Sequence, residues 1–114
     1  MRVTCQIDKN LPGFVKDVVE DRTTAKLSRF ENLIQDIHVT LRDINGPRGG
    51  IDMECQVRVR LRRHPDVIVT ERANRVEEAT SGALNRVTRS IGRRLAQQAR
   101  RVRTGTHRER LRAV

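Results

Sequence analysis

The stretch MECQVRVRLR, residues 53–62, decides the fold because apolar and polar side chains alternate along it without a break. Its apolar members are Met53, Cys55, Val57, Val59 and Leu61. Successive side chains of a strand point to opposite faces of a sheet, so this period of two predicts a strand with one buried face. The neighbouring segments must supply the rest of the sheet and a layer that covers it.

The segment just before this strand, RDINGPRGGID at residues 42–52, is rich in glycine. Residues 37–42 alternate like a strand, and the Asn45-Gly46 pair and Gly49-Gly50 allow the chain to reverse after them. We therefore predict a hairpin loop between two antiparallel strands.

A glycine-rich loop can also bind phosphate, but a nucleotide-binding P-loop ends in G-K-[ST] and leads into a helix. This loop lacks that ending and leads into a strand, so we predict no nucleotide triphosphate site. Asp43 and Asp52 are expected to bond loop amides or Arg48 rather than a metal ion. Arg48, at the tip of the loop, is a candidate RNA contact, and a solvated arginine is the alternative.

Farther out, residues 2–7 and residues 67–70 predict two more strands. Helical spacing runs from Phe14 to Phe30, where Thr23 is a weak point among the aliphatic residues of the buried face. A long second helix is predicted to begin at Asn74 as N-cap, with Glu77 as its capping-box partner. After about Val102 the periodicity is lost.

The predicted order is therefore β-α-β-β-β-α, an α+β fold of two layers. We expect a four-stranded sheet with both helices on one face, the first two strands parallel and the rest an antiparallel meander. Residues 1–102 form the predicted domain, and residues 103–114 a flexible basic tail.

Charge is strongly segregated along the 114 residues, whose net charge is +10. Residues 85–114 hold ten arginines and one acid, a net charge of +9, whereas residues 1–84 are nearly neutral at +1. Arginine suits phosphate because its planar fork donates two hydrogen bonds at once. Such segregation favours nucleic-acid binding over a basic face kept only for solubility, which is the alternative.

The candidate RNA-binding residues lie mainly on the second helix. At 100° per residue, four arginines fall within about 60° of one another and span about 21 Å. Two others point near the apolar stripe, and can bind RNA only if the helix runs past the edge of the sheet. Residues of the first helix are predicted to join them across the groove between the helices. The set comprises Arg86, Arg89, Arg93 and Arg100, then Arg94 and Arg101, and finally Arg22, Lys26 and Arg29.

A second basic surface competes with this one, on the open side of the sheet. It carries Arg2, Arg42, Arg58, Arg60 and Arg72. The sequence does not decide between the two surfaces, although we favour the helical one as the RNA-binding surface. The only aromatic residues, Phe14 and Phe30, are interpreted as packing residues, so recognition is expected to use phosphates, sugars and shape rather than base stacking.

No metal, cofactor or catalytic site is predicted. Cys5 and Cys55 occupy apolar strand positions and are expected to be buried, and His38, His64 and His107 are scattered singly. The acids are too dispersed for a nuclease, which is the enzyme that we considered. No apolar run could cross a bilayer and no signal peptide is visible, so a cytoplasmic location is expected.

Arg29-Phe30 and the stretch VTLRDINGPRGGIDMEC, residues 39–55, resemble the short form of the ribosome hibernation-promoting factor and ribosome-associated inhibitor family. The resemblance implies a fold similar to double-stranded-RNA-binding domains. It implies binding to small-subunit rRNA near the decoding region, competition with mRNA and tRNA, and translation inhibition under stress. Long members add a dimerisation domain that this chain lacks, so a monomer is expected. The alternative function is a general structured-RNA-binding protein or RNA chaperone.

Overall fold

The computed structural model describes residues 1–44 and 53–113, with side chains placed up to residue 100. Its elements follow the predicted order, with one short 3-10 helix added after the first α-helix. They are β1 (Arg2–Ile7), α1 (Phe14–Leu27), η1 (Ser28–Phe30), β2 (Ile34–Asp43), β3 (Met53–Leu61), β4 (Val67–Ala73) and α2 (Val76–Ala113).

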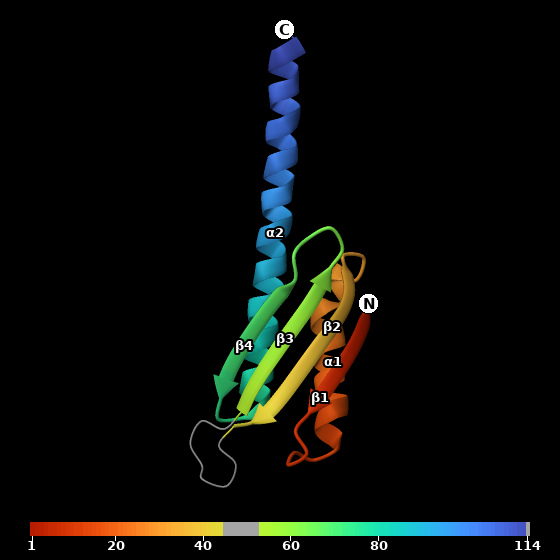
Figure 1. The fold of residues 1–114 in the computed structure, drawn as a ribbon, viewed down its shortest axis with the longest axis vertical. Helices are drawn as coiled ribbons and strands as arrows, with labels where there is room; N and C mark the ends of the chain where they lie inside the picture. The colour runs from red at the N-terminus through yellow and green to blue at the C-terminus, as the bar shows by residue number, and fades with distance from the viewer. Residues whose placement is uncertain (45–52, 114) are drawn as a thin grey trace.

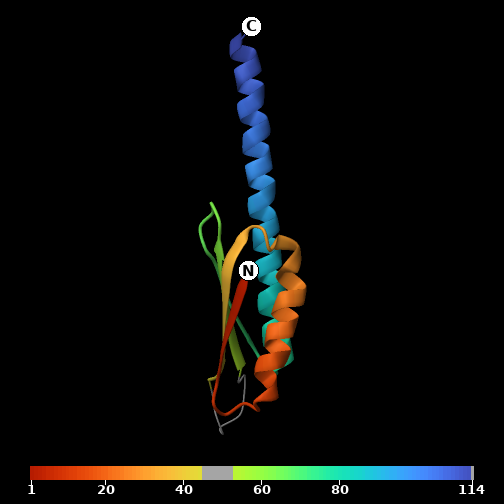
Figure 2. The same cartoon turned by 90° about the vertical axis from the view of Figure 1, so that its right-hand side faces the viewer.

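The four strands form one sheet in the order β1-β2-β3-β4. β1 pairs with β2 in parallel, with Cys5 opposite Val39, and β2, β3 and β4 pair antiparallel. Both helices cover the same face of the sheet, as Figure 2 shows. The predicted α+β fold of two layers is therefore confirmed. Asp43 pairs with Met53, so the glycine-rich segment joins antiparallel neighbours, but residues 45–52 themselves lie outside the described residues.

The core is aliphatic and lies between the sheet and the helices. Along α1 the buried positions recur every four residues, at Val15, Val19, Thr23 and Leu27. The Thr23 hydroxyl donates a hydrogen bond of 2.7 Å to the Val19 carbonyl oxygen, which explains how a polar group is accommodated there. α1 ends at Leu27, earlier than predicted, and Phe30 packs against the core from η1.

α2 differs from the prediction at both ends. The first helical hydrogen bond runs from the Ala79 amide to the Arg75 carbonyl, 3.1 Å, so Arg75 and not Asn74 takes the N-cap position. At the other end the helix continues past Val102 to Ala113. Past Val102, arginine, glutamate, leucine and alanine are strong helix formers, and they outnumber the weaker residues 104–107, of which Gly105 costs about 1 kcal/mol relative to alanine.

This long α2 gives the molecule its shape. The described chain measures 70 × 25 × 17 Å, and the C-terminal part of α2 projects well beyond the sheet (Figure 1). None of the helices within the described residues is long and apolar enough to span a membrane.

Candidate nucleic-acid interface

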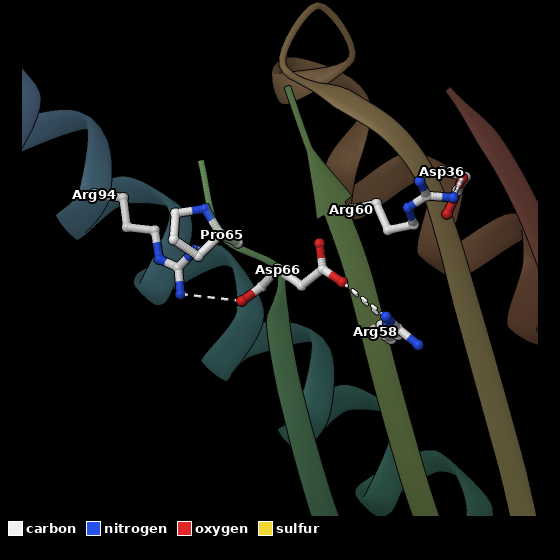
Figure 3. A network of polar contacts seen from close by, with 6 residues as sticks. All are labelled: Asp36, Arg58, Arg60, Pro65, Asp66 and Arg94. Atoms are coloured by element: carbon white, nitrogen blue, oxygen red, sulfur yellow. Dashed lines mark hydrogen bonds and ion pairs between the residues drawn. The ribbon is translucent and has the colours of Figure 1, made fainter. Parts of the chain in front are cut away.

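The arginines on the open side of the sheet are engaged with acids. Arg58 binds the Asp66 carboxylate through Nε and Nη2 at 3.1 and 2.9 Å, and Arg60 binds Asp36 at 3.2 Å (Figure 3). Each acid comes from a neighbouring strand or turn, so the sheet itself brings the charges together. Much of the positive charge predicted on this surface is thereby neutralised.

Glu54 neutralises two more arginines at one end of this surface. Its buried carboxylate lies 2.5 Å from Nη2 of Arg42 on β2 and 3.0 Å from Nε of Arg72 on β4. The hydrogen bond from Arg42, supported by Arg72, lowers the pKa of Glu54 against the opposing effect of burial. Because the β2–β3–β4 register places Arg42, Glu54 and Arg72 side by side, these two ion pairs are a product of the fold.

The predicted row of arginines on α2 divides into members with different surroundings. Arg86 binds Glu71 on β4 at 2.9 Å and the Thr70 carbonyl at 3.0 Å, so it ties α2 to the edge of the sheet. Gly82 makes room for this contact, because a Cβ atom there would lie 2.8 Å from Cγ of Glu71. Arg89 is exposed and has no polar partner among the described residues.

Farther along α2, Arg93 and Arg94 face different surroundings. Arg93 is exposed and makes one long contact of 3.4 Å to the Ser90 hydroxyl, and Arg100 is also exposed. Arg94 is half-buried and donates hydrogen bonds to the carbonyl oxygens of Pro65 and Asp66 in the β3–β4 turn (Figure 3).

Two cations of α1 line the groove between the helices. Arg22 and Lys26, with Ala25, form one wall of a cavity of about 300 Å³, and Ser81, Leu84 and Asn85 of α2 form the other. Among the described residues no arginine of α2 lines this cavity, so the two basic sets do not meet in it. Arg29 instead stacks its guanidinium over the Phe30 ring, 4.6 Å from the ring centroid.

Phe14 contradicts the interpretation of both phenylalanines as packing residues. Its side chain is 67% exposed, because the buried stripe of α1 begins one residue later at Val15. The ring lines a cavity of about 470 Å³ together with Val18, Arg22 and Arg75. Arg75, which we did not single out in the sequence, is exposed, and its guanidinium has no polar partner in the described part of the chain.

The cysteines are buried, as predicted. Burial raises the pKa of the Cys5 thiol to about 11, and that of Cys55 likewise to about 11. The Thr80 hydroxyl opposes the rise at Cys55, although it makes no hydrogen bond of standard geometry. Among the described residues, no group of three or more histidine, cysteine or acidic side chains could hold a metal ion. Arg48 and the side chain of Arg101 lie outside the described part of the chain.

The family described as "Sigma 54 modulation protein / S30EA ribosomal protein" matches residues 10–100. The chain belongs to this family. The match confirms the resemblance inferred from residues 29–30 and 39–55.

Solved structures share the fold of this S30EA family member. The N-terminal domain of Protein Y from Thermus thermophilus is 21% identical, with a TM-score of 0.61 over 82% of this chain and 98% of that one. A ribosomal subunit interface protein from Coxiella burnetii is 13% identical, with a TM-score of 0.64 over 84% of this chain and 99% of that one. No curated protein matches the sequence. The likeness to double-stranded-RNA-binding domains stays a prediction.

Proposed function

We propose that this S30EA-family protein binds rRNA of the small ribosomal subunit through its helical face. Near the decoding region it would exclude mRNA and tRNA and silence ribosomes under stress, as the family resemblance implies. The names of the similar structures, Protein Y and a ribosomal subunit interface protein, support a ribosomal partner. With such a partner the protein would work in the cytoplasm.

One contrast carries the choice of face. On the sheet, Arg42, Arg58, Arg60 and Arg72 are held by three acids, whereas no polar contact within the described chain engages Arg22, Lys26 or Arg89 on the helices. A carboxylate beside a guanidinium offsets its positive charge, so a paired arginine attracts a phosphate less strongly than an unpaired one. The helical cations have no such carboxylate, and α2 continues beyond the sheet (Figure 1).

The test compares two triple variants that remove equal charge. The helical variant changes Arg22, Lys26 and Arg89 to Ala, and the control changes Arg42, Arg58 and Arg60 to Ala. Each is sedimented with small subunits at several salt concentrations, and thermal melting verifies that it is folded. We expect the helical variant to bind at least tenfold more weakly at 0.15 M salt and its salt slope to fall by about 2–3, roughly 0.7–0.9 per phosphate contact.

The control variant should keep most of its affinity. If it loses binding while the helical variant keeps it, the sheet is the interface. If the wild-type protein binds unrelated RNA duplexes as tightly as small subunits, it is a general structured-RNA-binding protein instead.

A further inference from the structure

A polar cavity of about 460 Å³ lies where α2 passes the turn between β3 and β4. Its lining side chains are cationic, imidazole or amide groups, apart from one proline, and no carboxylate of the described residues lines it. They are Arg63, His64 and Pro65 of the turn and Arg94, Gln97 and Gln98 of α2. Only Arg94 belongs to the RNA-binding set predicted from the sequence.

The one acid of this turn is directed elsewhere. Asp66 presents its backbone carbonyl to Arg94, while its carboxylate binds Arg58 on the open side of the sheet, as Figure 3 shows. Because the carboxylate is paired with Arg58 and does not line the cavity, it repels an anion there less than an unpaired carboxylate in the lining would. The orientation of Asp66 thus accounts both for its ion pair with Arg58 and for its absence from the cavity lining.

Internal contacts fix the walls in place. Arg94 is anchored by the carbonyls of Pro65 and Asp66, and His64 Nε2 lies 3.0 Å from Oε1 of Gln98. A guanidinium has five N–H donors, so Arg94 retains donors beyond those two bonds. The turn holds Arg63 at a φ of 67°, a left-handed conformation that is uncommon outside glycine. Arg63 is exposed and has no polar partner among the described residues, so its guanidinium is available to a ligand.

We propose that this turn–helix cavity is a binding site for a phosphate group. Arg63 and Arg94 supply the charge-assisted hydrogen bonds that phosphate oxygens accept, and the amides of Gln97 and Gln98 supply neutral donors. The volume exceeds that of a single anion and lies within the range of small-molecule sites. The phosphate is either part of an RNA backbone or the end of a free nucleotide. The RNA source rests on the proposed function, and the nucleotide source does not.

The chain offers a matched control for each of two variants. Arg63→Gln removes a charge that lines the cavity, and Arg62→Gln removes the same charge from the exposed neighbour that does not line it. Gln97→Glu introduces a repelling carboxylate into the lining, and Ala96→Glu introduces it at the exposed neighbour outside the lining. Net charge is equal within each pair, so a difference reports the cavity and not the general field.

The experiment is a titration of the isotope-labelled full chain with inorganic pyrophosphate, adenosine diphosphate and a short RNA duplex, followed by NMR. We expect saturable shifts confined to residues 62–66 and 94–98. Arg63→Gln and Gln97→Glu should weaken binding about tenfold or more, the loss of one charge-assisted hydrogen bond, while their controls change it less than threefold. The same spectra show whether each variant is folded.

The probes distinguish the sources. A response to the duplex alone assigns an RNA backbone phosphate, and a tighter response to adenosine diphosphate assigns a free nucleotide. Equal losses in a variant and its control, or no saturable shift with any probe, would overturn the site. If wild-type protein binds pyrophosphate here but does not sediment with small subunits, the proposed function fails and the phosphate site stands.

Discussion

Glu54 shows how one buried acid can neutralise part of a basic surface. Its carboxylate, only 8% exposed, accepts hydrogen bonds from two arginines on the strands flanking β3. Glu54→Gln should lower the free energy of unfolding by about 1–2 kcal/mol at pH 7, because it removes charged hydrogen bonds and leaves Arg42 and Arg72 facing each other. Chemical unfolding by urea measures this difference.

The pH dependence of that difference follows from the lowered pKa of Glu54. The folded protein favours the ionised carboxylate more than the unfolded chain does, so its contribution is fully present above the ordinary value of 4.5. It is lost as the pH falls through the lower, folded-state pKa. Wild type and Glu54→Gln should therefore differ in stability at pH 7 and converge toward pH 3. A difference that stays constant across this range would contradict the argument.

Residues 53–62 predicted their strand and its buried face correctly because alternation is a local property of the sequence. The partners of the arginines were not predictable in the same way. Arg60 and Asp36 are 24 residues apart, and Arg72 and Glu54 are 18 apart, so each pair depends on the register between strands. The exposure of Phe14 depends likewise on which residue begins the buried stripe. The sequence thus predicted which charged residues belong to the candidate site. It did not predict which of them are free of ion pairs and so available to bind RNA.

Among the elements, α2 departs most from what periodicity indicates. Its apolar stripe predicted the part that packs on the sheet, where Ala79, Ala83, Val87 and Ile91 are buried. Apolar periodicity marks only the part of a helix that packs on the sheet, so it cannot predict where a helix ends beyond the sheet. Beyond that point intrinsic propensity matters more. Residues 104–107 are weak helix formers, whereas most of residues 108–113 are strong ones, and the helix continues to Ala113. Arg94 lies on the same side of α2 as the apolar stripe, but beyond the end of the core. The β3–β4 turn is its neighbour there, so its side chain donates hydrogen bonds to that turn.

Two glycines of α2 allow a prediction about this element. A Cβ atom added at Gly92 would have no neighbour within 4 Å, whereas at Gly82 that atom would meet the Glu71 side chain. Gly92→Ala should raise the free energy of unfolding by about 0.5–1 kcal/mol, from helix propensity and reduced freedom of the unfolded chain. Gly82→Ala should gain less, because Glu71 must move and its 2.9 Å bond to Arg86 is strained. Urea unfolding of both variants tests this, and an equal gain would show that Glu71 shifts at no cost.

On the scale of the whole molecule, the folded body and the projecting helix have separate roles. The last α2 side chain packed against the core is Leu95 among the described residues, and the contact of Gln98 with His64 follows it. Beyond that point the sequence is dominated by arginine. We therefore expect this arginine-rich part of α2 to contribute little to the stability of the fold.

Deleting residues 103–114 tests that separation and the domain boundary predicted near Val102. The deletion removes Arg103, Arg108, Arg110, Arg112 and Glu109, a net charge of +3. We expect the free energy of unfolding to change by less than about 0.5 kcal/mol, as for surface changes, because the core formed by the described side chains ends at Leu95. Affinity for small subunits should fall, and the salt slope should decrease by up to about 3–4. A large loss of stability would show that the segment packs on the body, whereas an unchanged salt slope would show that RNA contacts end before Arg103.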